Sequence, residues 1–323
     1  MIIFNYFYHK ISLMYLVRKI RISIMNIKEF FKQFRVFDGG MGQELLARGI
    51  KPISNLWSAT ALLKEEYHQT VIDTHIDFIN AGAEVILTNT FGARLRRCED
   101  TKIVDKFEYL NQTAVNLAKK AVDKSGKKIL IGASLPPQNF TYMSDLGPDK
   151  NKIFENFKKQ ADLINEGTDF FYLDVMCSLE EAEIGINSIK HLNKEFIVGL
   201  HYKKDGKLPS GEYFIDVLKA LKKYKPLAVT GSCVSVEDTL SMKKDLKDID
   251  IPFGFKINAF KEIPFGWKPD ATNPNEVLGK DTDITTEKFL NISQQLIDLG
   301  SKIIGGCCEI TPSHISELKK LKC

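Results

Sequence analysis

The chain has 323 residues, of which 44% are hydrophobic and 27% are charged, with a net charge of +4. These proportions are ordinary for a soluble globular protein, and the lysines form no basic stripe, so nucleic acid is not expected as a partner. Six cysteines in a chain of this length do not make a disulfide framework. Their number fits a reducing compartment, so we expect a cytoplasmic protein whose thiols serve metal binding or catalysis.

The first 25 residues are rich in Ile, Phe, Tyr and Leu, but they are interrupted by His9, Lys10, Arg18, Lys19 and Arg21. A signal peptide has an unbroken apolar stretch, and a membrane-spanning helix needs about 20 apolar residues. Neither pattern is present, so no membrane span is expected. We interpret residues 1–27 as an N-terminal extension that is disordered or follows a misassigned start, with Met25 opening the natural chain. An amphipathic membrane-surface segment is the alternative.

Eight short apolar runs follow, each ending in small or polar residues: 35–39, 84–90, 128–134, 170–176, 196–202, 227–233, 252–258 and 302–307. Segments with helical spacing lie between them at 62–81, 109–125, 151–167, 179–192 and 286–299. This alternation is typical of a (β/α)8 TIM barrel, with a doubly wound open sheet as the competing α/β fold. No linker rich in Pro and Gly divides the body, so we predict a single barrel domain over residues 28–323.

Three cysteines stand at the predicted carboxyl ends of strands, where a TIM barrel places its active site. Cys233 ends the sixth run, and Cys307 and Cys308 end the eighth after two glycines. Neighbouring side chains of a strand point to opposite faces, so both thiols reach one ion only where the chain turns, and the glycines permit such a turn. We therefore predict a metal site formed by Cys233, Cys307 and Cys308. Cys98, Cys177 and Cys323 are interpreted as non-ligands, with Cys177 as the one rival.

Zinc suits three thiolates, and a catalytic zinc site keeps one position for water or substrate. Three thiolates make the ion a poor Lewis acid for splitting water, but a coordinated substrate thiol is deprotonated outright. Because the thiolate is the reactive nucleophile, the pattern indicates alkyl transfer to a bound thiol. For any one of these cysteines taken alone, a buried small apolar residue is the plain alternative.

Four motifs in order extend this pattern over residues 36–321: Phe-Asp-Gly-Gly-Met-Gly-Gln-Glu-Leu (37–45), Ala-Gly-Ala-Glu-Val-Ile-Leu-Thr-Asn-Thr-Phe-Gly (81–92), Gly-Ser-Cys (231–233) and Gly-Gly-Cys-Cys-Glu-Ile-Thr-Pro-Ser-His-Ile (305–315). With them the chain resembles the homocysteine S-methyltransferase family. The family includes betaine–homocysteine and S-methylmethionine–homocysteine methyltransferases and the homocysteine module of methionine synthase. The resemblance implies Zn²⁺ on the three predicted cysteine ligands, with the homocysteine sulfur as fourth ligand. It also implies that Asp38, Gly39 and Thr90 hold the amino-acid end of homocysteine.

The chain departs from the family pattern at the fourth strand, where Asp174 stands in place of the usual glutamate. The charge is kept, but its reach is one methylene shorter, so the contact with the substrate ammonium is expected to change. The third-strand motif and Ser232 also differ from the family. Trp57 stands where betaine enzymes carry a tryptophan that contacts the donor, and a cationic donor favours such an aromatic wall. Further candidates for the mouth are Phe91, Phe140, Tyr142, Phe265 and Trp267.

The resemblance predicts a methyltransferase that makes methionine from homocysteine and a small donor. Candidate donors are betaine, S-methylmethionine, dimethylsulfoniopropionate and S-adenosylmethionine. One alternative is a homocysteine-activating module that takes the methyl group from a separate corrinoid protein. The other is a non-catalytic barrel that binds zinc or an amino acid. The sequence leaves open whether the chain forms a homo-oligomer. Arg94, Arg96 and Arg97 are interpreted as a solvated helix face, with a donor carboxylate as the less favoured partner.

Overall fold

The computed structural model describes residues 26–247, 249–264, 266–267 and 278–322. Two compact units divide the chain, Met1–Gln33 and Phe34–Cys323. In the first, helix α2 (Ile27–Phe30) begins after Asn26, whose side chain accepts hydrogen bonds from the amides of Lys28 and Glu29. The interpretations of residues 1–25, Phe265 and Cys323 lie outside the described residues, and the boundary at residues 27 and 28 stays a prediction.

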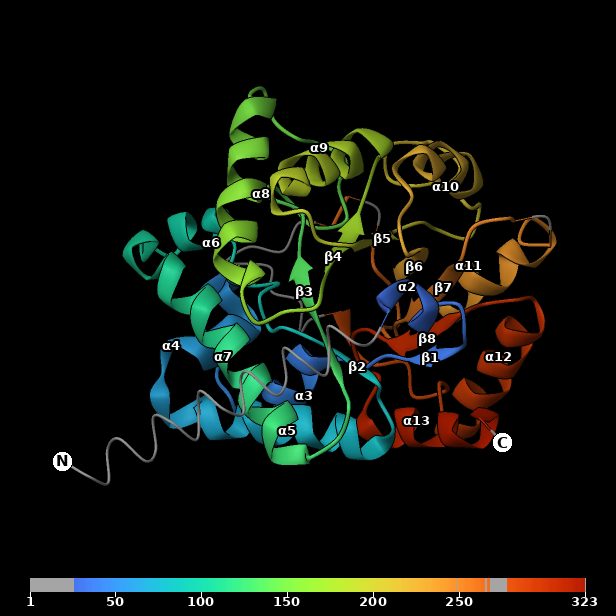
Figure 1. Cartoon of the computed structure of the whole chain (residues 1–323), viewed down its shortest axis with the longest axis horizontal. Helices are drawn as coiled ribbons and strands as arrows, with labels where there is room; N and C mark the ends of the chain where they lie inside the picture. The colour runs from blue at the N-terminus through green and yellow to red at the C-terminus, as the bar shows by residue number, and fades with distance from the viewer. Residues whose placement is uncertain (1–25, 248, 265, 268–277, 323) are drawn as a thin grey trace. The chain divides into compact units, whose positions relative to one another are not determined.

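The second unit is built on eight parallel strands (Figure 1). They are β1 (Arg35–Val36), β2 (Val85–Leu87), β3 (Leu130–Leu135), β4 (Phe170–Met176), β5 (Phe196–Leu200), β6 (Ala228–Val234), β7 (Phe253–Ile257) and β8 (Ile303–Gly306). Consecutive strands pair from β2 to β8, and β8 pairs with β1. A parallel bridge between Phe37 and Val85 joins β1 to β2 and closes the ring. The predicted TIM barrel is confirmed, and the open doubly wound sheet is wrong.

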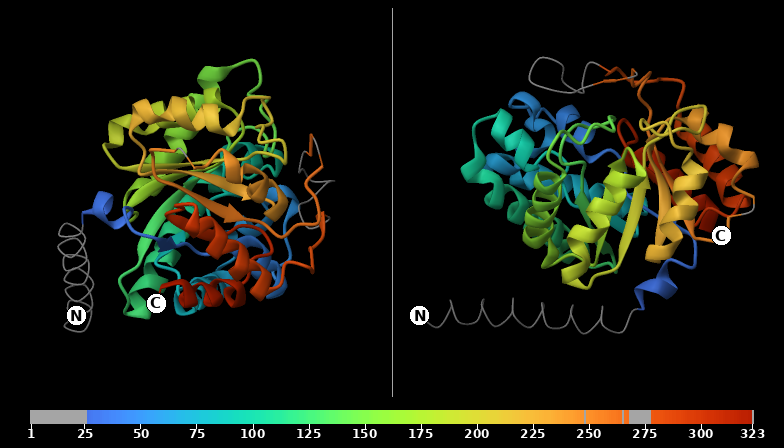
Figure 2. Two further views of the ribbon diagram at one scale, coloured as in Figure 1. Left: turned by 90° about the vertical axis from the view of Figure 1, so that its right-hand side faces the viewer. Right: turned by 90° about the horizontal axis from the view of Figure 1, so that it is seen from above.

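Helices surround the strands in Figure 1. They are α3 (Met41–Ala47), α4 (Thr60–Leu63), α5 (His68–Ala81), α6 (Leu95–Asp100), α7 (Phe107–Ser125), α8 (Lys150–Asn165), α9 (Leu179–Ile189), α10 (Phe214–Leu221), α11 (Val236–Ser241), α12 (Thr286–Asp298) and α13 (Pro312–Glu317). Within the described ranges, none of them is long and apolar enough to cross a membrane. In the left view of Figure 2 the orange segment that follows β7 lies at one end of the barrel, beyond the carboxyl ends of the strands.

One predicted helix, over residues 62–81, is wrong in its extent. The chain is extended at Lys64, passes through a 3-10 turn at Glu65–Tyr67 and only then forms α5. Helical spacing persists across this break because both pieces bury apolar side chains against the same part of the barrel, so periodicity alone does not reveal it. The stop predicted at Gly82 is confirmed, since Gly82 adopts the left-handed conformation that ends α5.

The strands are buried along their whole length, as expected for a parallel sheet covered by helices. All seven residues of β4 and all seven of β6 are buried. Helix α8 shows how the helices contribute to this core. Its buried positions recur every three or four residues and therefore form one face: Ile153, Asn156, Phe157, Gln160, Ala161 and Ile164.

We expect Phe157→Ala to lower the free energy of unfolding by about 3–5 kcal/mol, because it removes a fully buried ring and leaves a cavity. Urea unfolding followed by circular dichroism measures this. The control is Tyr109→Ala on α7, where the side chain is 38% exposed and a change within about 0.5 kcal/mol is expected. Equal destabilisation by the two variants would contradict this view of the core.

Candidate metal centre and substrate pocket

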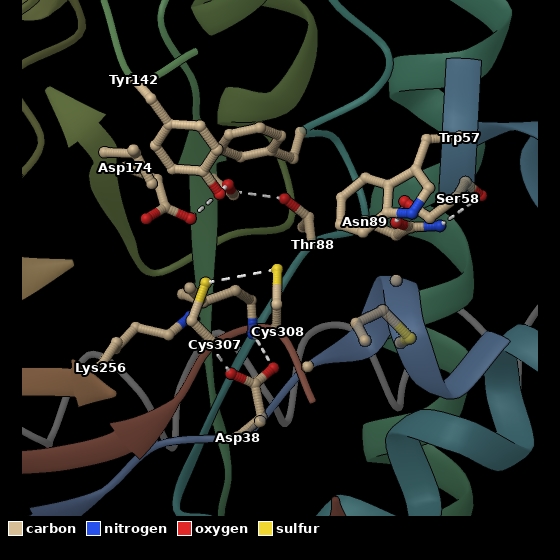
Figure 3. Close-up of a pocket in the computed structure, with 18 residues that line it drawn as sticks. Asp38, Trp57, Ser58, Thr88, Asn89, Tyr142, Asp174, Lys256, Cys307 and Cys308 are labelled. Atoms are coloured by element: carbon tan, nitrogen blue, oxygen red, sulfur yellow. Dashed lines mark hydrogen bonds and ion pairs between the residues drawn. The ribbon is translucent and has the colours of Figure 1, made fainter. Parts of the chain in front are cut away.

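Three cysteine side chains meet at the carboxyl end of the barrel. The Sγ atoms of Cys233, Cys307 and Cys308 all lie within 4.8 Å of one another, and those of Cys307 and Cys308 are 3.9 Å apart. Thiolates at 2.3 Å from a tetrahedral zinc ion are separated by roughly 3.8 Å, so the three donors fit such an ion with little adjustment. Figure 3 shows the sulfur atoms of Cys307 and Cys308 pointing into the pocket, towards Tyr142 and Asp174.

Irregular backbone brings these thiols together. The pairing of β6 with β7 shifts register between Ser232 and Val234, and Cys233, inside this bulge, has a φ of 55°. Beyond β8 the chain turns at once, as predicted for the adjacent pair. A Cβ on Gly306 would lie only 2.3 Å from Ile310 Cγ2, so glycine is needed for the close approach of this turn.

Further strained residues lie around the same pocket. Trp57, Tyr142 and Val175 have φ values of 51°, 64° and 66°, a region that side chains with a Cβ seldom adopt. These three residues pack in one cluster with Cys233 and Cys308. Such conformations cost about 1–3 kcal/mol each and persist only where the surroundings fix them, which is common at functional sites.

Hydrogen bonds around Cys233 favour its ionised form. The hydroxyl of Tyr142 lies 3.2 Å from Cys233 Sγ. Burial opposes ionisation of Cys233, but hydrogen bonds from Cys307, Cys308 and Tyr142 hold the pKa of its thiol well below the ordinary value. Burial and the neighbouring Cys233 raise the pKa of Tyr142 well above its usual range, which favours the neutral tyrosine as the hydrogen-bond donor to the sulfur. These contacts favour a thiolate at Cys233 over one at Cys307 or Cys308, whose pKa values are raised.

The thiols lie beside a pocket that is lined by both aromatic and polar side chains. Its residues are Asp38, Gly39, Gly40, Met41, Gly42, Trp57, Ser58, Leu87, Thr88, Asn89, Phe91, Ser134, Tyr142, Asp174, Val175, Lys256, Cys307 and Cys308. Trp57 and Phe91 meet edge to face with ring centroids 6.4 Å apart, and Trp57 Nε1 donates to Gln43 Oε1 at 3.2 Å. The structure therefore brings Asp38, Gly39, Asp174 and Trp57 into one pocket with the cysteines.

Thr90 does not line this pocket. Its hydroxyl is buried in the barrel wall, where it donates to the carbonyl of Ser134 at 2.5 Å and lies 2.9 Å from the hydroxyl of Thr88. Thr88, two residues earlier, lines the pocket instead. A substrate contact of Thr90 stays a prediction.

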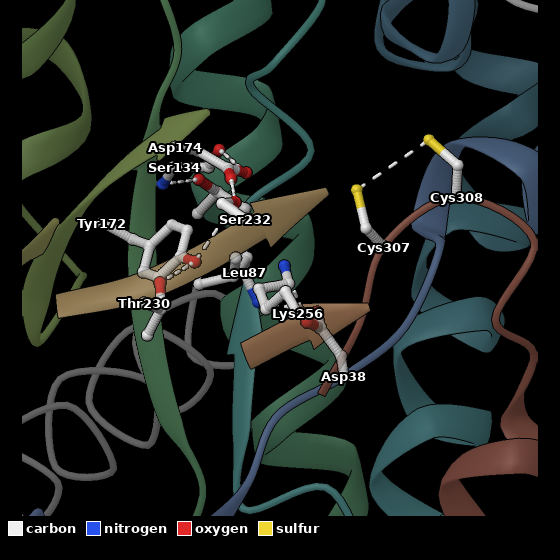
Figure 4. A network of polar contacts seen from close by, with 11 residues as sticks. Asp38, Leu87, Ser134, Tyr172, Asp174, Thr230, Ser232, Lys256, Cys307 and Cys308 are labelled. Carbon is white, nitrogen blue, oxygen red and sulfur yellow. Dashed lines mark hydrogen bonds and ion pairs between the residues drawn. The ribbon is translucent and has the colours of Figure 1, made fainter. Parts of the chain in front are cut away.

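A buried charged group occupies the base of the pocket. Asp38 Oδ2 accepts a hydrogen bond from the amide of Leu87 at 2.8 Å, and its Oδ1 lies 3.8 Å from Lys256 Nζ. Asp174 Oδ1 accepts from the Ser232 hydroxyl at 2.5 Å, and its Oδ2 accepts from Ser134 at 3.4 Å (Figure 4). Burial raises the pKa of each aspartate to about 6, against the opposing effect of the Lys256 charge.

Lys256 was missed by sequence reasoning, although a signal was present. It is the one charged residue in the strand Phe-Gly-Phe-Lys-Ile of β7, which is otherwise apolar and fully buried. A charge is seldom buried without a partner, so a lysine in such a run indicates an anion nearby. Burial acts to lower the pKa of Lys256, but the charges of Asp38 and Asp174 outweigh it and raise the pKa above the ordinary value.

The arginines after β2 are not the solvated face that was predicted. Arg94 and Arg97 are each only 2% exposed, because their segment turns under the loop that follows β3. Arg94 Nη1 and Nη2 donate to the Pro137 carbonyl and the Thr141 hydroxyl at 2.5 and 2.8 Å. Together with Arg96 Nη1, which donates to Asn139 Oδ1 at 3.1 Å, Arg94 holds the loop that carries Tyr142. Arg96 stays partly exposed and packs over the ring of Phe140.

Comparison with known proteins agrees with this geometry. The sequence profile of the family described as homocysteine S-methyltransferase matches residues 35–321. The chain belongs to the homocysteine S-methyltransferase family. It is 25% identical to homocysteine S-methyltransferase 2 of Saccharomyces cerevisiae over 89% of this chain and 93% of that protein. It is 24% identical to homocysteine S-methyltransferase 1 of Arabidopsis thaliana over 88% and 92% of the two chains.

The fold is also similar to that of a solved homocysteine methyltransferase. The metallated form of the homocysteine methyltransferase MmuM from Escherichia coli superimposes with a TM-score of 0.72 at 19% identity, covering 90% of this chain and 96% of that one. The match to methionine synthase of Mycobacterium tuberculosis covers 88% of this chain but only 24% of that much longer protein, at 24% identity. The family membership makes the chain a methyltransferase.

Proposed function

We propose that this protein transfers a methyl group from a small cationic donor to homocysteine, giving methionine, with zinc held by Cys233, Cys307 and Cys308. The observation that carries the proposal is the group of three sulfur atoms within 4.8 Å at the edge of a pocket lined by two carboxylates and an aromatic wall. A bound zinc ion would keep the acceptor sulfur in its nucleophilic thiolate form, because a coordinated thiol is deprotonated.

The acceptor's ammonium group is assigned to Asp38 and Asp174. Both carboxylates are buried in the pocket, and Asp38 Oδ1 has no hydrogen-bond partner among the described residues. Hydrogen bonds from Ser232 and Ser134 hold the Asp174 carboxylate in place. A preoriented carboxylate binds an ammonium group through short charge-assisted hydrogen bonds, which fixes the position of the acceptor relative to the cysteines.

The donor is assigned to the aromatic side of the pocket. The rings of Trp57, Phe91 and Tyr142 line it, and such rings attract the positive ammonium or sulfonium group of a donor. In the transfer, a C–S bond forms to the acceptor sulfur while the bond from the methyl carbon to the donor's nitrogen or sulfur breaks. Both electrons of the broken bond stay with the donor atom, so its positive charge is discharged. Positioning of the two reactants supplies much of the rate.

The first test is methionine formation by zinc-loaded protein from homocysteine with betaine, S-methylmethionine, dimethylsulfoniopropionate and S-adenosylmethionine, each supplied separately. We expect one of these donors to be productive, because the pocket supplies both an aromatic wall and acceptor-binding charges. Failure of all four, in protein shown to hold one zinc ion, would contradict a free-standing donor. It would favour the corrinoid-protein alternative, for which the partial match to methionine synthase is the supporting observation.

Cys308→Ala is expected to remove most of the bound zinc and to lower methionine formation by more than about 100-fold, because one of three protein ligands is lost. Metal analysis of the purified protein and the activity assay measure the two effects. Cys177→Ala is the matched control for metal content, since Cys177 is also buried but lies outside the cluster. If a Cys308→Ala protein without zinc keeps its turnover, the proposal that zinc takes part in methyl transfer is wrong.

The pH dependence tests the carboxylates. With a pKa of about 6, Asp174 is ionised at pH 7.5 and mostly protonated at pH 5, so its attraction for an ammonium group is lost as the pH falls. We expect the KM for homocysteine to rise at least tenfold over this interval. Asp174→Asn should raise the KM at pH 7.5 by about 10- to 100-fold and leave a smaller pH dependence, since Asp38 also has a pKa of about 6.

Asp205→Asn is the control for this experiment, because Asp205 is exposed and does not line the pocket with the cysteines. Its KM and pH profile should match those of the unchanged protein. An Asp174→Asn protein that keeps both the KM and its pH dependence would show that Asp174 does not bind the acceptor.

A further inference from the structure

Lys256 has an ammonium group that the described residues leave without hydrogen-bonded partners. The side chain projects from β7, is 4% exposed and lines the pocket beside Cys307 and Cys308. Its contacts in the described ranges are Asp38 Oδ1 at 3.8 Å and the ring of Tyr172 at 5.3 Å from the centroid. Both are too long for hydrogen bonds, yet a lysine has three N–H groups to donate.

The two nearby aspartates do not satisfy the N–H groups of Lys256, because other groups hold each carboxylate in place. Asp174 is held by Ser232 and Ser134, and Ser232 in turn lies 3.3 Å from the hydroxyl of Tyr172. Asp38 is held on one side by the amide of Leu87. Figure 4 shows Lys256 between Asp38 and the group formed by Tyr172, Ser232 and Asp174. The pocket therefore offers one fixed cation and two fixed anions within the reach of a single small ligand.

This charge pattern is complementary to a zwitterion. An α-amino acid carries a carboxylate and an ammonium group on the same carbon, and a buried site that supplies an opposite charge for each binds both without leaving a charge unpaired. The ammonium group of an aminothiol without a carboxylate would pair with the two aspartates. The N–H groups of Lys256 would then be buried beside the ligand without a hydrogen-bond acceptor. A site built in this way rejects an analogue that lacks the matching polar group.

We propose that Lys256 Nζ binds the carboxylate of the thiol acceptor while Asp38 and Asp174 face its ammonium group, so that Lys256 restricts the acceptor to α-amino acids. The proposal rests on the proposed function for the identity of the acceptor. It adds a specificity-determining residue to the pocket. The competing role for Lys256 is that of an internal counter-ion, which keeps Asp38 and Asp174 ionised and touches no substrate.

Comparing the binding of two thiol acceptors distinguishes a carboxylate-binding role of Lys256 from a counter-ion role. L-Homocysteine and 3-aminopropane-1-thiol share the thiol, the amine and the chain between them, and differ in the carboxylate. Their dissociation constants are measured by calorimetry on the zinc-loaded full-length protein without any methyl donor. We expect the unchanged protein to bind L-homocysteine about 10- to 100-fold more tightly than the aminothiol, as charge-assisted hydrogen bonds would give.

Lys256→Met should remove most of this preference by weakening L-homocysteine binding and leaving aminothiol binding within about threefold. Loss of affinity for both acceptors by the same factor would overturn the proposal in favour of the counter-ion role. Lys203→Met is the matched control, because Lys203 is a half-buried lysine just after β5 that does not line this pocket. Its preference ratio should equal that of the unchanged protein.

Lys256→Met leaves two buried carboxylates without their cation and can fail to fold, which circular dichroism would show. The double variant Asp38→Asn, Lys256→Met removes one negative charge with the positive one and restores the balance. Both acceptors carry the ammonium group, so the ratio of their affinities still reports the carboxylate contact. A ratio near one in this variant supports the proposal, and a ratio equal to that of Asp38→Asn alone overturns it.

Failure of the proposed function gives a different result from failure of this inference. If no donor yields methionine but the preference for L-homocysteine depends on Lys256, the methyl transfer is wrong and the acceptor contact stands. If methionine forms and the preference is the same with and without Lys256, the function stands and the contact is wrong.

Discussion

The site depends on closure of the barrel. Hydrogen bonds from Glu84 N to Val36 O at 2.8 Å and from Asp38 N to Val85 O at 3.0 Å join the first two strands, so the sheet has no free edge there. Because all eight strands are parallel, their carboxyl ends lie at the same end of the ring. Side chains that are far apart in the sequence, such as Asp38, Cys233 and Cys308, therefore face one another across a short distance.

Closure alone does not aim the side chains, and local irregularities complete the arrangement. Strands β4 and β6 both shift register near their carboxyl ends, at Val175 and Cys233, and both residues have positive φ. A bulge redirects a side chain that would otherwise follow the alternation of the strand. The strain is held by packing, since Trp57, Tyr142, Val175 and Cys233 belong to one buried cluster. The cysteine cluster and the aromatic residues of the pocket are thus stabilised by the same contacts.

Electrostatics links the three clustered cysteines to the buried charges of the pocket. The pKa values of Asp38 and Asp174 are raised by burial and by the nearby Cys307, and Lys256 offsets both effects. Buried charges are costly, and an ion group of this kind contributes less to stability than apolar residues of the same volume would. Its retention is therefore explained better by ligand binding than by folding. Under the proposed function, a pocket with fixed charges of both signs would orient a zwitterionic acceptor.

Prediction from sequence was accurate for features that depend on residue types close together in the chain. The eight strands were found because continuous apolar runs mark buried parallel strands, and β4 has the predicted bounds at residues 170–176. The cluster of three thiols was predicted because residues at the carboxyl ends of barrel strands lie at the same end of the ring. Glycine permits the turn before Cys307 that lets both adjacent thiols join the cluster. The break at Lys64 was missed because both sides of it keep the same periodicity.

The sequence by itself determined the barrel, the three clustered cysteines and the family, since each follows from residue types at fixed spacing along the chain. Only the tertiary structure decided which polar groups face the pocket. Whether Thr90 or Thr88 points inward, whether Arg94 is exposed, and which anions surround Lys256 depend on bulges, loop packing and the tilt of neighbouring strands. These features arise from contacts between segments that are far apart in the sequence, such as Asp38 and Lys256, which no local pattern records.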